Sequence, residues 1–130
     1  MKFGYTIVYV PNVAASLKFF EAAFGISTRF LHESGTYGEL ETGATALAFA
    51  AHALGDDNFP GGHVAAHTSV QPLGFEVALV TEDVATAHTK ALGAGARELA
   101  APKTKPWGQV VSYVRCPDGV LVELCSPMGG

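Results

Sequence analysis

Positive charge is scarce in this chain, and its few basic residues are scattered. Only eight Lys and Arg occur among 130 residues, against twelve Asp and Glu, which gives a formal net charge of −4. Proteins that bind nucleic acid concentrate Lys and Arg on one face or along one helix. No such basic stripe is present, so we expect no nucleic-acid partner. The acidic balance mildly favours a basic ligand, because it raises the local concentration of cations.

Cysteine is also rare, and long apolar runs are missing. Cys116 and Cys125 are the only two cysteines, and no Cys-x-x-Cys pair suggests a zinc site. We expect two free buried thiols, with a disulfide between neighbouring strands as the alternative. No run of about 18 apolar residues exists, so no membrane span is expected. The first residues lack the charged, apolar and small-residue order of a signal peptide. These features predict a cytoplasmic protein.

Apolar residues are abundant, and the first half of the chain arranges them in a clear order. Hydrophobic residues make up 48% of the sequence, enough for the core of one domain. Residues 3–10 alternate like a strand, Asn12 is a good helix N-cap, and an apolar face at helical spacing follows. Gly25 stands where a helix C-terminus favours a left-handed residue. Three short strands are then predicted, at residues 26–33, 37–41 and 45–51.

The second half of the chain repeats this order. A strand is predicted at residues 75–80, Asp83 is the second N-cap, and a helical face follows that Gly93 ends. Further strands are predicted at residues 96–100, 109–115 and 120–125, the last two joined by the turn Pro117-Asp118-Gly119. Such internal duplication indicates two copies of one βαβββ unit.

The two units form one domain, residues 1–130, with modules at about 1–52 and 74–127. Residues 52–73 between them hold several Gly and Pro and show no period, so we expect a long loop, which is often functional. The fold class is α+β. Two half-open sheets can bury their faces only against each other or against a second chain, so a homodimer is expected.

Three segments resemble the vicinal oxygen chelate superfamily, which includes glyoxalase I, bleomycin-resistance proteins and extradiol dioxygenases. The first is residues 10–25, VPNVAASLKFFEAAFG; the others are residues 105–108, KPWG, and residues 113–124, YVRCPDGVLVEL. Their order and separation match the family along the whole chain. The resemblance implies that the two modules form cup-shaped mixed sheets, with ligand and metal held inside a cup.

Metal-dependent members of that family take one ligand from the first and last strand of each module, and these ligands are typically His or Glu. The corresponding positions here are Tyr5, Ala48, Glu76 and Glu123. Tyr5 is a poor ligand for divalent metals and Ala48 cannot bind one, whereas catalytic zinc or nickel sites need three or more donors with imidazole among them. The chain therefore resembles the drug-binding branch of the family, and we expect no metal cofactor.

Strand alternation places both glutamates on the cup side. Glu76 lies opposite Val77 in the pleat, and Glu123 lies opposite Val122 and Leu124. Two close carboxylates in a partly dry site raise one pKa, and they can share a proton, bind a cation or hold a hard metal. The alternative is that each glutamate is paired with a basic side chain or solvated.

Several other side chains are candidates for contact with a ligand. Trp107, the only tryptophan, could stack on a planar ligand at the cup rim, or plug the core. Tyr5 and Phe49 are candidate walls of the cup, and the small residues around Ala48 would leave room for a ligand. Phe59, in the connection, could fold over a ligand as a lid or pack on the domain surface.

Histidine supplies no clear metal motif. His63 and His67 are four residues apart, a spacing that shares a face only on a helix, but Gly61 and Gly62 before them favour a loop. His52 is expected to be a solvated loop residue. His88, in the second helix, is expected at the surface.

These observations favour a small-molecule binding protein, which holds an antibiotic or another aromatic compound in the cup without metal. The alternative is a metal-dependent lyase or dioxygenase-like enzyme that uses Glu76 and Glu123, in which case magnesium or manganese would suit the carboxylates better than zinc. A third hypothesis is that side chains fill the cup and that the domain serves only as a scaffold.

Overall fold

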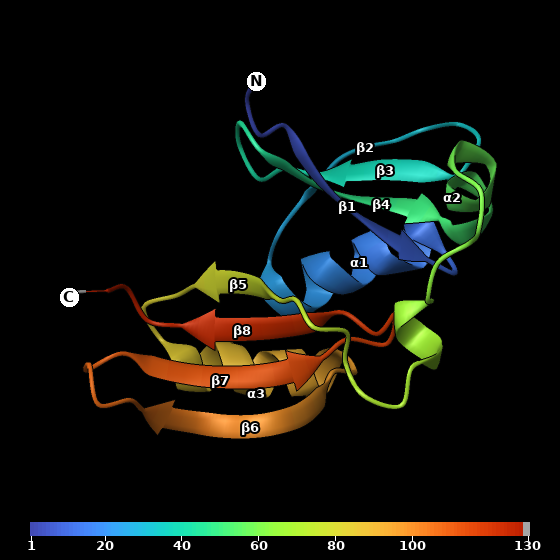
Figure 1. Ribbon diagram of the computed structural model, residues 1–130. Coiled ribbons are helices and arrows are strands. Elements are labelled where there is room, and N and C mark those ends of the chain that lie inside the picture. The colour runs from blue at the N-terminus through green and yellow to red at the C-terminus, as the bar shows by residue number, and fades with distance from the viewer. Residues whose placement is uncertain (129–130) are drawn as a thin grey trace.

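The computed structural model describes residues 1–128 and contains two four-stranded mixed sheets, each with one long helix (Figure 1). The first module comprises β1 (Tyr5–Val10), α1 (Val13–Phe24), β2 (Thr28–Leu31), β3 (Tyr37–Leu40) and β4 (Ala46–Ala51). The second comprises β5 (Val77–Val80), α3 (Val84–Ala94), β6 (Arg97–Thr104), β7 (Val110–Arg115) and β8 (Leu121–Cys125). The strand orders are β1-β4-β3-β2 and β5-β8-β7-β6, with β1–β4 and β5–β8 parallel. The predicted pair of βαβββ modules is confirmed.

The caps of both long helices are local and follow from the sequence. The Asn12 side chain accepts a hydrogen bond from the Ala15 amide at 3.0 Å, and Asp83 does the same for Thr86. Gly25 ends α1 in the left-handed conformation, at φ 70°. The second helix, however, continues through Gly93 and ends at Gly95, so the expected stop at Gly93 is wrong.

The connection between the modules is more ordered than expected. It contains a short helix, α2 (His52–Asn58), and a 3-10 turn, η1 (Ala66–Thr68). Gly55 lies inside α2 because a Cβ at this position would meet the Tyr9 ring at 2.8 Å. The expectation of a structureless loop over residues 52–73 is therefore wrong for its first third.

The helices lie between the two sheets and form the core. α1 packs against β2, β3 and β4, α3 packs against β6, β7 and β8, and the two helices contact each other. The core combines both modules, with Val10, Phe20 and Leu40 from the first and Val114 and Val122 from the second. A buried hydrogen bond of 2.7 Å from Ser16 on α1 to Asp118 in the β7–β8 turn also joins the modules.

One histidine and both cysteines are buried inside the domain. His88 on α3 is buried, not at the surface, and its two ring nitrogens lie 2.9 Å from Ser112 Oγ and 2.7 Å from Glu98 Oε2. Both cysteines are free and buried, as predicted.

The opposite face of each sheet has no helix over it. On β1 this face exposes Tyr5 by 59% and Ile7 by 44%, whereas Val8 and Val10 beside them are buried. On β5, Val80 is exposed in the same way. Within residues 1–128, none of the helices has the length and apolar character needed to cross a membrane.

Candidate functional site

Glu76 and Glu123 meet on the open face of the second sheet. Glu123 is directly opposite Ala78 on β5 and Tyr113 on β7, while its neighbours on β8 point into the core. Tyr113 donates a hydrogen bond of 2.7 Å to Glu123 Oε1. Glu76 immediately precedes β5, two residues before Ala78, and so reaches the same place.

Glu123 raises the cost of ionising Glu76. Partial burial raises the pKa of Glu76, and hydrogen bonding and charge repulsion from Glu123 raise it further. The pKa of Tyr113 rises to about 12, first because its hydroxyl donates to Glu123 and then because of burial. Among the described residues, no Lys, Arg or His forms an ion pair with either glutamate. The pair is therefore a site of uncompensated negative charge.

The first sheet presents a second polar cluster on its open face. Ile7, Ala48 and Glu39 are register partners across β1, β4 and β3, so all three lie on the face away from α1. Tyr37 donates to Glu39 Oε2 at 2.8 Å, and burial is the main reason that the pKa of Tyr37 is raised. Ala48 itself is buried between its longer neighbours.

This cluster differs from the pair on the second sheet because it contains a cation. Arg29 on β2 lies 2.8 Å from Glu41 and 3.4 Å from Glu39, measured between guanidinium nitrogen and carboxylate oxygen. The hydrogen bond from Arg29 holds the pKa of Glu41 below its usual range. The carboxylates of the first sheet are thus neutralised within the chain, and those of the second sheet are not.

The sequence analysis missed Tyr37, Glu39 and Tyr113. The alternation of Tyr37, Glu39 and Glu41 along one strand was a usable signal, since it places all three on one face. For Tyr113, the link to Glu123 depends on the pairing of β7 with β8, which periodicity within one strand does not reveal.

The predicted aromatic residues do not gather around the glutamates. Phe49 is 0% exposed and its ring lies 5.1 Å from that of Phe20 in the core, so the expectation that it lines the cup is wrong. Its register partners, Val8 and Gly38, belong to the helix-covered face. Trp107 is exposed in the β6–β7 turn, and its indole donates to Gln109 at 2.9 Å.

Phe59 and the histidines of the connection cover one end of the first sheet. The ring of Phe59 lies 6.4 Å from that of Tyr9 on β1, so Phe59 packs on the domain itself. His52 Nδ1 and His63 Nε2 are 2.8 Å apart, and the His67 ring is 5.2 Å from that of His52. His52 is therefore not a solvated loop residue, and burial with the neighbouring imidazoles lowers its pKa.

The residues at the family's metal positions do not fit a metal site. Ala48 carries no donor atom, and Tyr5 lies on the first sheet whereas Glu76 and Glu123 lie on the second. Two carboxylates alone fall short of the three or more protein donors that such centres use. Throughout residues 1–128, no three His, Cys, Asp or Glu side chains are arranged to hold a metal ion.

Within one chain, the two open faces do not join into a cup. β1 and β5 lie at free edges of separate sheets, and no pairing between them is present in the described part of the chain. Tyr5 and Ala48 lie on one open face, and Glu76 and Glu123 lie on the other.

Comparison with known proteins agrees with this fold. The family model described as Glyoxalase/Bleomycin resistance protein/Dioxygenase superfamily matches residues 2–124. A glyoxalase-related enzyme from Fulvimarina pelagi superposes with a TM-score of 0.82 at 19% identity, over 98% of this chain and 88% of that one. A family enzyme from Burkholderia phytofirmans PsJN gives 0.78 at 17% identity, over 97% and 98% of the two chains.

A third similar structure is TioX from Micromonospora sp. ML1, with a TM-score of 0.69 at 17% identity, over 97% of this chain and 98% of that one. A comparison with curated protein sequences found no significant match. At these identities the solved structures establish the fold alone, but the family model covers nearly the whole sequence. The chain therefore belongs to the glyoxalase/bleomycin resistance protein/dioxygenase superfamily.

Proposed function

We propose that this protein binds a small cationic molecule with an aromatic portion, and does so without a metal. The observation that carries the proposal is the pair Glu76 and Glu123, one exposed and one half-buried, with no basic partner among the described residues. A cation bound between the two carboxylates would relieve the repulsion between them. This relief would contribute to binding.

Aromatic side chains on the open faces support the second part of the proposal. Tyr113 lies beside Glu123, and Tyr5 and Tyr37 lie on the face of the first sheet. A cation close to a tyrosine ring gains electrostatic attraction from the ring face, and a flat ligand gains contact area from it.

A second copy of the chain would turn two open half-sites into closed ones. The first sheet offers tyrosines and small alanines, and the second offers uncompensated carboxylates, but in one chain these faces do not meet. In a two-fold dimer, the first sheet of one protomer would face the second sheet of its partner, and this would create two equivalent cups. Both the ligand and the homodimer belong to this proposal.

A series of benzene derivatives that differ only in charge tests the ligand class. Benzamidine is cationic, benzamide neutral and benzoate anionic, and their binding to the protein can be measured by calorimetry and by NMR shifts. We expect benzamidine to bind most tightly and benzoate least tightly. In Glu123→Gln the preference for benzamidine should fall at least tenfold, whereas Glu82→Gln, which removes an exposed carboxylate elsewhere, should leave it unchanged.

Equal binding of benzoate and benzamidine would contradict the proposal. Metal analysis of the same preparations tests the enzyme alternative. A stoichiometric divalent metal that is lost in Glu123→Gln would instead favour a metal-dependent lyase or dioxygenase-like enzyme.

A further inference from the structure

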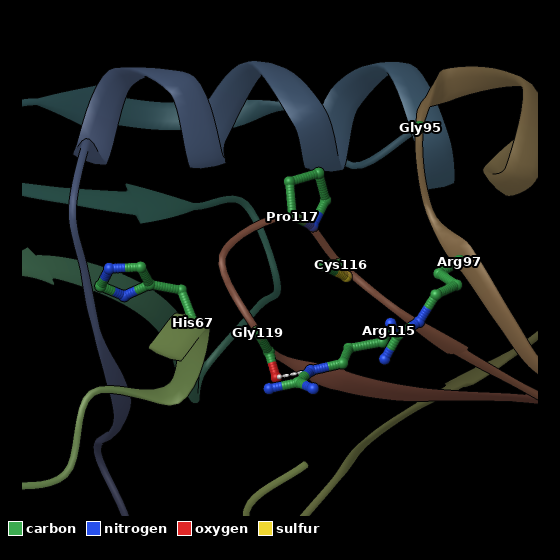
Figure 2. A pocket seen from close by; sticks show the side chains of 7 residues that line it. All are labelled: His67, Gly95, Arg97, Arg115, Cys116, Pro117 and Gly119. Carbon is green, nitrogen blue, oxygen red and sulfur yellow. Dashed lines mark hydrogen bonds between the residues drawn. The ribbon is translucent and has the colours of Figure 1, made fainter. Parts of the chain in front are cut away.

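Two arginines lie directly opposite each other at one end of the second sheet. Arg97 begins β6 and Arg115 ends β7, and the two are register partners. A cavity of about 230 Å³ opens here, and Figure 2 shows both arginine side chains at one side of it; His67 from η1 also lines it, with its ring directed away from the arginines. The remaining lining residues are Gly95, Cys116, Pro117 and Gly119.

The charges around this cavity are not balanced within the chain. Like charges directly opposite each other on antiparallel strands destabilise the sheet. Arg29, the third arginine, has Glu39 and Glu41 as partners, but neither Arg97 nor Arg115 forms an ion pair in the part of the chain that the structure describes. None of the residues that line the cavity is acidic. In a protein of net charge −4, two facing arginines without a counter-ion require an explanation.

Arg115 is held rigidly, but its charge is not neutralised. It is 8% exposed, and its guanidinium donates hydrogen bonds to the carbonyls of Ala66, Ser69, Val70 and Gly119 and to Ser69 Oγ. These acceptors are dipoles without formal charge. Nη1 uses only one of its two hydrogens, in the 3.1 Å bond to Val70. A fixed, largely buried cation with a remaining donor favours binding of an anion.

We propose that this cavity binds an oxyanion, the phosphate or carboxylate group of a small molecule, between Arg97 and Arg115. Guanidinium groups bind such oxygens by paired, charge-assisted hydrogen bonds. Arg97 is exposed and can turn toward a ligand, whereas Arg115 is already in place. The cavity has the volume of several water molecules, which is enough for the anionic group of a ligand and a few attached atoms.

This site does not depend on the proposed cation cup. Although Arg115 lies only two residues from Tyr113 on β7, the residues that line the cavity include neither Glu76 nor Glu123. The loss of cation binding at Glu123 would therefore leave the anion site unaffected, and the two proposals can fail separately.

Inorganic phosphate is the first probe, with sulfate and acetate as further arms, all at constant ionic strength set by sodium chloride. Binding can be followed by calorimetry and by amide NMR shifts. We expect phosphate to bind the folded protein and to shift amides of residues 66–70, 95–97 and 115–119. Binding of phosphate and sulfate alone would identify a phosphate-type group, whereas binding of acetate as well would show that the site also accepts a carboxylate.

A pair of variants with the same change of charge separates a defined site from general attraction. Arg97→Gln should weaken phosphate binding at least tenfold, and Lys103→Gln, on the same strand but outside the cavity, should leave it unchanged. Arg115 is kept, because its bonds hold the connection in place. Equal losses in the two variants, or a phosphate response no larger than that of chloride, would overturn the proposal.

Discussion

At the residue scale, Glu76 and Glu123 hold charge that costs the folded protein stability at neutral pH. The folded-state pKa of Glu76 lies above its ordinary value, through burial and through Glu123. A group with a raised pKa contributes its stability below the unfolded pKa, and this contribution is lost as the pH rises through the folded pKa. The carboxylate pair therefore weakens the fold progressively as the pH rises from acid to neutral.

We predict that Glu76→Gln stabilises the protein at pH 7 but not at about pH 3.5, where an unfolded glutamate is itself protonated. Because Glu76 is exposed to solvent, the gain in the free energy of unfolding should be below about 1 kcal/mol. Urea denaturation at the two pH values measures it. Glu82→Gln is the matched control and should show no comparable gain; a gain of equal size at both pH values would contradict the prediction.

Strand alternation was enough to predict that Glu76 and Glu123 share the open face. It did not distinguish Ala48 from Phe49, which were both expected in the cup although neighbours in a strand point to opposite faces. Tyr113 was missed for a different reason. Its contact with Glu123 depends on which strand lies beside which, and this pairing is set by the whole fold.

At the element scale, the β7–β8 turn joins three parts of the molecule. Asp118 accepts the buried bond from Ser16 on α1, and Arg115 binds carbonyls of the connection. Gly119 lies directly beneath the backbone of Ala66, so that a Cβ at this position would overlap the Ala66 carbonyl. The turn was predicted from its Pro-Asp-Gly sequence, but its role as a junction appears only in the fold.

Gly119→Ala should destabilise the protein more than Gly108→Ala does. Both glycines have positive φ, 92° and 93°, so alanine is strained at either position by about 1–2 kcal/mol. Only Gly119 has backbone within reach of the added methyl group, since the space around Gly108 is open. Overlap with packed backbone adds about 1–3 kcal/mol.

The free energies of unfolding of the two glycine variants, from urea titrations, measure this difference. Equal losses would mean that the connection moves away from the turn without cost. The anion cavity beside Gly119 should then be tested again in that variant, because its wall would have moved.

The long helices were predictable because their signals are local, whereas α2 was not. Asn12, Gly25 and Asp83 act within four residues of their positions, and all three do what their residue types predict. α2 has no side-chain cap and contains Gly55, and glycine is unfavourable in the interior of a helix. The Tyr9 ring occupies the space that a side chain at this position would need, so the glycine is explained by a partner more than forty residues away.

At the scale of the whole molecule, the contact between α1 and α3 determines which surfaces remain open. Both sheets direct one face toward these helices, so their other faces point away from the shared core (Figure 1). The free edge strand β1 exposes Tyr5 and Ile7, and the free edge strand β5 ends at the exposed Val80. Exposed apolar edge strands are prone to association unless a partner covers them. A second copy of the chain would cover the open faces of both sheets.

We predict that the protein is a dimer in solution and that Ile7→Glu shifts it toward monomer. Ile7 is on the exposed face of β1, and a glutamate there would face the uncompensated carboxylates on the second sheet of the partner subunit and be repelled by them. The dissociation constant of the dimer, from analytical ultracentrifugation, should rise at least tenfold. Ala85→Glu adds the same charge on the exposed side of α3 and should leave the dimer intact.

The same Ile7→Glu variant links assembly to binding. If each cup combines the first sheet of one protomer with the second sheet of its partner, loss of the dimer must also weaken benzamidine binding, although Glu76 and Glu123 are unchanged. Raising the protein concentration of the variant should then restore dimer and binding together. A monomer that binds benzamidine as tightly as the parent protein would show that the second sheet is sufficient by itself, and the shared cup would be wrong.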